Sequence, residues 1–67
     1  MKFEIRDSKS STQPYYWRII ASNGQVLATS ETYTTKQGCR DAIDIVKRGA
    51  APALVADQTR SAAAARY

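Results

Sequence analysis

The chain has 67 residues, a formal net charge of +4, one cysteine and no histidine. This length limits it to one small domain, and the missing histidine excludes Ser-His-Asp and Cys-His catalysis as well as the usual structural zinc sites. One cysteine cannot form an intrachain disulfide, so self-association is the expected way for so small a core to gain stability.

The compartment and the charge give two further expectations. A lone cysteine and a polar start without an apolar leader predict a cytoplasmic protein that has no membrane partner. The positive charge is dispersed, because half of the excess comes from Arg60 and Arg66 near the end of the chain. A dispersed excess favours a role in solubility over a continuous phosphate-binding track.

The first predicted element is a strand at the start of the chain. Phe3 and Ile5 alternate with charged residues, which is the period of a strand with one buried face. The polar segment 7–14, rich in Ser and Thr, predicts a flexible loop after this strand.

A β-hairpin is predicted next. Residues 15–21 are dense in aromatic and β-branched side chains, which favour a strand. Asn23 and Gly24 predict a two-residue type I′ turn, in which both residues have positive φ, followed by an antiparallel strand over residues 25–30. The pattern does not decide whether the face of Trp17 or the opposite face forms the core.

A helix is predicted over residues 35–48. Thr34 is the expected N-cap, with Gln37 bonding back in a capping box, and Gly49 is the expected stop. An apolar stripe at helical spacing should lie on the sheet and comprises Cys39, Ala42, Ile43 and Val46.

The last predicted element is a short apolar strand over residues 53–56. The domain is therefore assigned to residues 1–57. Residues 58–67 have no apolar periodicity and are predicted to be a disordered tail.

The order of three strands, a helix and a last strand is similar to that of the YegP-like family. The resemblance covers residues 2–57 and is carried by Ala21-Ser22-Asn23-Gly24, Thr29-Ser30-Glu31 with Tyr33, Ala42-Ile43 and Val46-Lys47. It implies an α+β fold in which an antiparallel sheet of β-β-β-α-β order carries one helix. It also implies a homodimer in which two copies share a sheet and exchange their C-terminal strands, here residues 53–56. It implies no activity.

Candidate catalytic chemistry is sparse. Cys39 lies near the helix start, where a thiolate is favoured, but its place on the apolar stripe favours a structural role. Asp41 and Asp44 have basic neighbours that explain them as ion pairs, and there is no glycine-rich phosphate loop. We therefore expect no enzyme activity, no metal and no cofactor.

The remaining hypothesis is a binding or interaction module. Aromatic and basic side chains on one strand face, joined by two cations at the helix end, form the candidate surface Tyr16, Arg18, Ile20, Lys47 and Arg48. Its partner would be a protein or a small ligand. Weak nucleic-acid binding through a basic and aromatic sheet face is the alternative, and it requires Arg18, Lys47 and Arg48 to converge.

Overall fold

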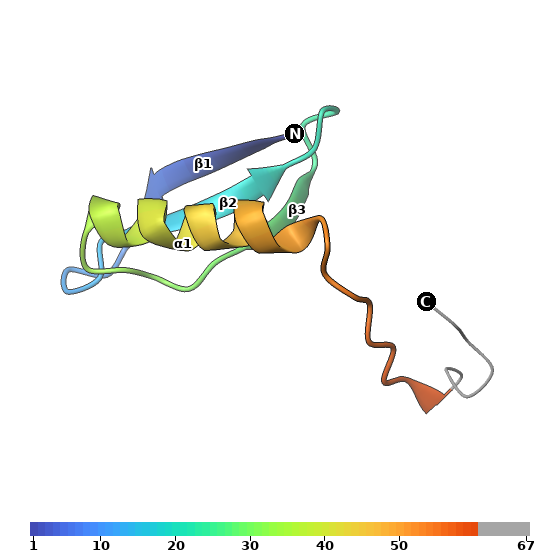
Figure 1. Cartoon of the computed structure of the whole chain (residues 1–67). Helices are drawn as coiled ribbons and strands as arrows, with labels where there is room; N and C mark the ends of the chain where they lie inside the picture. Colours follow the sequence, from blue (N-terminus) through green and yellow to red (C-terminus); the bar gives the residue numbers. More distant parts are fainter. Residues whose placement is uncertain (61–67) are drawn as a thin grey trace.

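The computed structural model describes residues 1–60 and contains three strands and one helix. They are β1 (Lys2–Asp7), β2 (Tyr15–Ile20), β3 (Val26–Thr29) and α1 (Lys36–Ala50). The strands form one antiparallel sheet in the order β1-β2-β3, and α1 packs on one face of it (Figure 1). The predicted α+β class, with an antiparallel sheet and one packed helix, is confirmed.

The central strand β2 decides which face of the sheet is the core. Phe3 lies opposite Ile19 and Ile5 lies opposite Trp17 in the register with β1. Because side chains alternate across a strand, all four point to the same face. The rings of Phe3 and Trp17 meet with their centroids 5.9 Å apart, and Trp17 is buried. The face of Trp17 is therefore the one that packs against α1.

The helix begins one residue later than predicted. Thr35 is the N-cap, with φ of −134°, and its hydroxyl oxygen accepts from the Gly38 N–H at 2.9 Å. Gln37 donates to Asp41 at 2.9 Å and makes no capping box. The assignment of Thr34 as the cap was wrong, because either threonine has the right side chain and only the backbone path selects between them.

The helix also ends later than predicted. It runs through Gly49 to Ala50, and Ala51 still has helical angles of φ −61° and ψ −46°. Gly49 is therefore not a C-terminal stop. The helix ends where Pro52 supplies no N–H for the next intrahelical hydrogen bond.

The turn between β2 and β3 has three residues and not two. The Ala21 carbonyl accepts from the Gly24 N–H at 2.9 Å, and the Ala21 N–H donates to the Gln25 carbonyl at 2.8 Å. Gly24 has a positive φ of +88°, whereas Asn23 does not. This turn needs one left-handed residue, so glycine alone supplies it and the type I′ prediction was wrong.

The edge strand β3 is left uncovered. Ala28 lies opposite Ile19 and Val26 lies opposite Ile20, so Leu27 between them is an extra residue and forms a bulge. α1 packs on β1 and β2 but not on β3, and every residue of β3 is exposed. One edge of the sheet therefore presents uncharged side chains to solvent.

The final strand predicted at residues 53–56 is not formed within the single chain. After Pro52 the chain runs away from the sheet (Figure 1), and residues 53–58 carry no secondary structure. A strand needs a neighbouring ladder, and this path reaches neither edge of the chain's own sheet. Most of the tail predicted to be disordered, residues 61–67, lies outside the described residues, so the division at residue 57 stays a prediction.

Two glycines test the hairpin and the helix end with changes of opposite sign. Gly49→Ala should raise the free energy of unfolding by about 0.5 kcal/mol, because alanine is the better helix former and nothing lies within 4 Å of the added Cβ. Gly24→Ala should lower it by about 1 kcal/mol, because φ is positive there although space is open. Urea denaturation measures both free energies of unfolding. A loss of stability in Gly49→Ala would contradict a helix that continues through Gly49.

Candidate functional site

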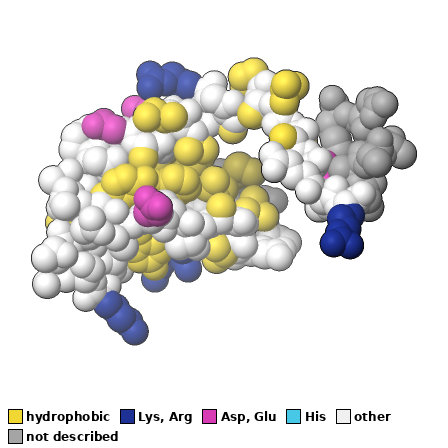
Figure 2. Space-filling view, turned by 90° about the horizontal axis from the view of Figure 1, so that it is seen from below, with side chains coloured by type: hydrophobic (Ala, Val, Ile, Leu, Met, Phe, Trp, Pro, Cys, Tyr) yellow, Lys and Arg dark blue, Asp and Glu magenta, His cyan; other side chains and the backbone are white. Residues whose placement is uncertain are grey.

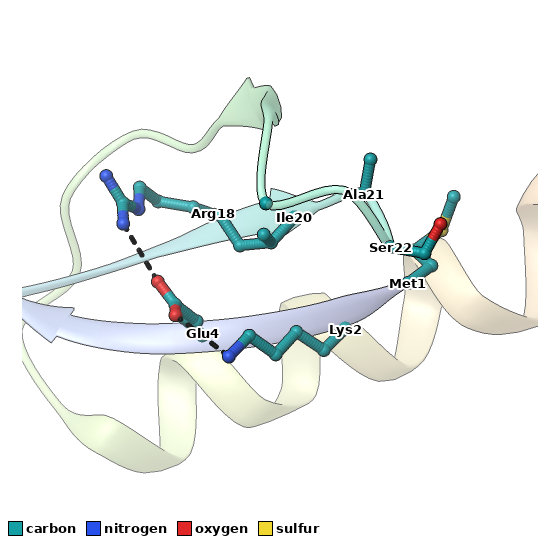
Figure 3. Close-up of a pocket in the computed structure, with 8 residues that line it drawn as sticks. Met1, Lys2, Glu4, Arg18, Ile20, Ala21 and Ser22 are labelled. Atoms are coloured by element: carbon teal, nitrogen blue, oxygen red, sulfur yellow. Dashed lines mark hydrogen bonds and ion pairs between the residues drawn. The ribbon is translucent and has the colours of Figure 1, made fainter.

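A cluster of charges lies at the centre of the sheet face that points away from α1. Glu4 on β1 and Arg18 on β2 lie directly opposite each other, and Glu4 Oε1 accepts from Arg18 Nη2 at 2.9 Å. Arg6 Nη1 lies 3.4 Å from the same oxygen, and Lys2 Nζ lies 3.4 Å from Oε2. Figure 3 shows Arg18 and Lys2 on either side of the carboxylate. One anion therefore contacts three cations.

These contacts stabilise the charged forms of the groups. The hydrogen bond from Arg18 is the main cause that holds the pKa of Glu4 below its ordinary value, and Lys2 adds to it. Hydrogen bonding to Tyr16 is the main cause that raises the pKa of Arg6, and hydrogen bonding to Glu4 adds to it. The contacts therefore favour the charged forms of Glu4 and Arg6, and the cluster has an excess of positive charge.

A hollow of about 510 Å³ adjoins this cluster at the hairpin end of the sheet. It is lined by Met1, Lys2, Glu4, Arg18, Ile20, Ala21, Ser22 and Gly24. Charged side chains lie at one end of the hollow, and small and apolar side chains lie at the other (Figure 3).

Ile20 does not have the exposure that the candidate surface assumed. Its side chain points away from α1, yet it is only 5% exposed. Lys2 and Val26 lie opposite it on the two neighbouring strands. Tyr16 and Arg18 are half-buried, so this face is polar at its surface and the apolar side chain lies beneath it.

The structure separates the five predicted surface residues. Tyr16, Arg18 and Ile20 lie on the open face of the sheet, whereas Lys47 and Arg48 lie in the last turn of α1 on the other side. Within one chain, the three cations on which the nucleic-acid hypothesis depends do not converge.

The sequence reasoning missed the contribution of β1 to the open face. Lys2, Glu4 and Arg6 reach the cluster because β1 pairs with β2 in this register. The alternation of these charges with Phe3 and Ile5 was visible in the sequence. The sequence did not show that these charged residues would lie beside Arg18 on β2.

An apolar groove of about 460 Å³ lies between the end of α1 and the other face of the sheet. It is lined by Met1, Phe3, Ile19, Leu27, Val46, Lys47, Ala50 and Ala51. Figure 2 shows hydrophobic side chains gathered in a band across the middle of the molecule, with one acidic side chain beside the band and the other charged groups in view towards the margins. The groove extends from β1 across β2 to the bulge of β3.

Cys39 is the most deeply buried side chain, with no exposed surface, and burial raises the pKa of its thiol. Both observations favour the structural role. Within residues 1–60, no group of His, Cys, Asp or Glu side chains is placed to hold a metal ion, and no helix is long and apolar enough to span a membrane.

The charge cluster predicts a defined dependence of stability on pH. The folded state holds the pKa of Glu4 below its unfolded value, so this stabilisation is present above the unfolded pKa and is lost as the pH falls through the folded pKa. The free energy of unfolding should fall less steeply between about pH 5 and 3 in Glu4→Gln than in the wild type. Glu31→Gln is the control, since Glu31 forms no ion pair within residues 1–60. Identical slopes for the wild type and Glu4→Gln would contradict the cluster.

The burial of Cys39 predicts slow thiol chemistry. The native protein should react with a thiol reagent at least about a hundredfold more slowly than the unfolded protein, because the sulfur is reached only by opening the core. The control variant combines Ser22→Cys with Cys39→Ala, which places the thiol on the exposed hairpin. Its thiol should react as fast in the native protein as in the unfolded protein. Equal rates for the two thiols in native protein would mean that Cys39 is accessible.

Comparison with known proteins identifies the family. The sequence profile of a domain of unknown function, DUF1508, matches residues 10–57. A UPF0339 protein of Neisseria meningitidis serogroup B is 44% identical over 48 residues, which cover 70% of this chain and 80% of the relative. A UPF0339 protein of Treponema denticola is 39% identical over 56 residues, which cover 84% and 93% of the two chains. An Agrobacterium fabrum relative is 40% identical over 58 residues, or 87% and 90%. The chain therefore belongs to the DUF1508 family, the YegP-like family of UPF0339 proteins.

Proposed function

We propose that this protein is a non-catalytic interaction module that works as a homodimer, in which residues 53–56 of each copy add a strand to the sheet of the other. The exposure of this segment carries the proposal. Leu54 is 89% exposed and Val55 is 64% exposed, although both are large apolar side chains. Burial of such side chains against a second copy stabilises the assembly by about 1.5–3 kcal/mol for each one.

The proposed receiving edge is that of β3. Its residues are uncharged and exposed, and α1 does not cover it. The other edge, β1, carries Lys2, Glu4, Arg6 and Asp7, and charged side chains disfavour the addition of a strand. A strand added beside β3 brings its apolar side chains next to Leu27, where the apolar groove opens.

The size of the core also supports a partner subunit. Only Trp17, Ile20 and Cys39 are buried hydrophobic residues among residues 1–60. The indole N–H of Trp17 is buried without a hydrogen-bond acceptor in this part of the chain, which costs about 1–3 kcal/mol. A single copy is therefore short of stabilising contacts that a second copy supplies.

Nucleic-acid binding ranks second in this proposal. Arg18 lies on the face of the sheet opposite to the helix that carries Lys47 and Arg48, so a single strand of nucleic acid meets only part of the positive charge.

The proposed location is the cytoplasm, which suits a single cysteine without a disulfide partner.

The first test is the solution mass by light scattering across a dilution series. The wild type should have the mass of two chains, and Leu54→Asp should have the mass of one, because an aspartate at the buried strand position must be desolvated. Gln58→Asp adds the same charge just outside the segment and should remain dimeric. A wild type that is monomeric at all concentrations would refute the homodimer.

A mixing experiment distinguishes exchange from simple contact between folded copies. Leu27→Asp should dissociate the dimer from the receiving side. An equimolar mixture of Leu27→Asp and Leu54→Asp chains restores one intact pairing, in which an unaltered strand meets an unaltered edge. The two-chain mass should then return in part. A mixture that stays monomeric would refute pairing between residues 53–56 and β3.

A further inference from the structure

We infer that the open face of the sheet binds a small monocarboxylate that carries a short apolar group, with Arg18 and Lys2 holding the carboxylate and the apolar group lying by Ile20. This inference names a ligand class for the proposed binding module. It does not require strand exchange, since the site uses the face away from α1 and lies apart from residues 53–56.

The charge balance of the hollow favours one added negative charge. Lys2 and Arg18 line it together with a single carboxylate, that of Glu4. One cation is therefore not neutralised within the hollow, and Arg6 adds another just outside it. A monocarboxylate supplies one charge, whereas a phosphate group carries nearly two at neutral pH.

Arg18 also has unused hydrogen-bonding capacity. Its Nη2 donates to Glu4, but its Nε is buried and has no acceptor among the described residues. Because a guanidinium has five donors in a planar fork, it can hold a second carboxylate beside the first. A ligand that draws the guanidinium towards itself gives the unsatisfied donor a partner.

The other end of the hollow suits a short hydrocarbon group. Met1 and Ala21 line it there beside Ser22 and Gly24 of the hairpin, and the 5% of Ile20 that is exposed lies between the charged pair and the turn (Figure 3). The volume of about 510 Å³ holds a ligand of a few carbon atoms with room to spare. The polar and apolar ends of the site thus match the two ends of such a carboxylate.

The test is a titration of isotope-labelled protein with sodium isobutyrate, followed by NMR at constant ionic strength and pH 7. The Arg18 Nε–H and the amides of residues 18–24 should shift and saturate, with a dissociation constant in the millimolar range. Acetate should bind about fifteenfold more weakly, because it lacks two carbons and each additional buried carbon is worth about fourfold. Inorganic phosphate should also bind more weakly than isobutyrate.

Variants separate the site from a general effect of charge. Arg18→Gln should weaken isobutyrate binding at least about tenfold, and Arg18→Lys, which keeps the charge but loses the fork, should weaken it by less. Glu4→Gln should tighten binding, because it removes the competing carboxylate. Arg40→Gln on the exposed side of α1 removes an equal charge and should have no effect.

Three results would overturn the inference. Shifts that rise linearly without saturation would mean that there is no site. Equal losses in Arg18→Gln and Arg40→Gln would mean that net charge alone attracts the anion. Phosphate binding as tight as isobutyrate binding would exclude the monocarboxylate class. Light scattering of the same samples reports the dimer separately, so failure of this site and failure of strand exchange are distinguishable.

Discussion

A single narrow helix face packed on a three-stranded sheet is the constraint on which the rest of this structure depends. The apolar stripe of α1 lies over β1 and β2, where Phe3 and Trp17 form the core, and it leaves β3 uncovered. One helix buries one stripe of side chains, and here that stripe does not extend to the third strand. The exposed edge and the apolar groove both follow from this incomplete coverage.

The two faces of the sheet have different chemistry because side chains alternate along each strand. On β1, Phe3 and Ile5 point to the helix, while the charged residues between them meet β2 on the other face. Arg18 then faces Glu4 directly and forms the shortest ion pair in the part of the chain that the structure describes, at 2.9 Å. The protein thus presents an apolar side, on which the proposed dimer depends, and a charged side, which carries the proposed anion site, on opposite faces of one thin layer.

Local patterns predicted the first three strands and the helix, but predicted their ends less well, and the strand predicted at residues 53–56 is not formed within the single chain. The hairpin and the helix stripe through Cys39 were correctly predicted, because they depend on side-chain periodicity. The ends were wrong by one or two residues where two neighbours offer the same chemistry, as Thr34 and Thr35 do for the cap. The hydrogen bonds across the polar loop after β1 were not predicted: Ser8 donates to the Gln13 carbonyl at 2.6 Å and accepts from the Ser10 N–H at 3.1 Å. Such bonds depend on how the loop closes, which composition does not reveal.

The sequence by itself determined the class of the fold, the pairing of the second and third strands, the helix and the lack of histidine-based chemistry, because these depend on residue types and on spacing along the chain. Only the tertiary structure decided that the face of Trp17 is the core, that Ile20 is buried on the opposite face and that Lys47 and Arg48 lie away from Arg18. It also brought Lys2, Glu4 and Arg6 to the same site as Arg18. The reason is that the register between β1 and β2 and the placement of α1 join residues far apart in the chain, and no local pattern encodes which of them meet.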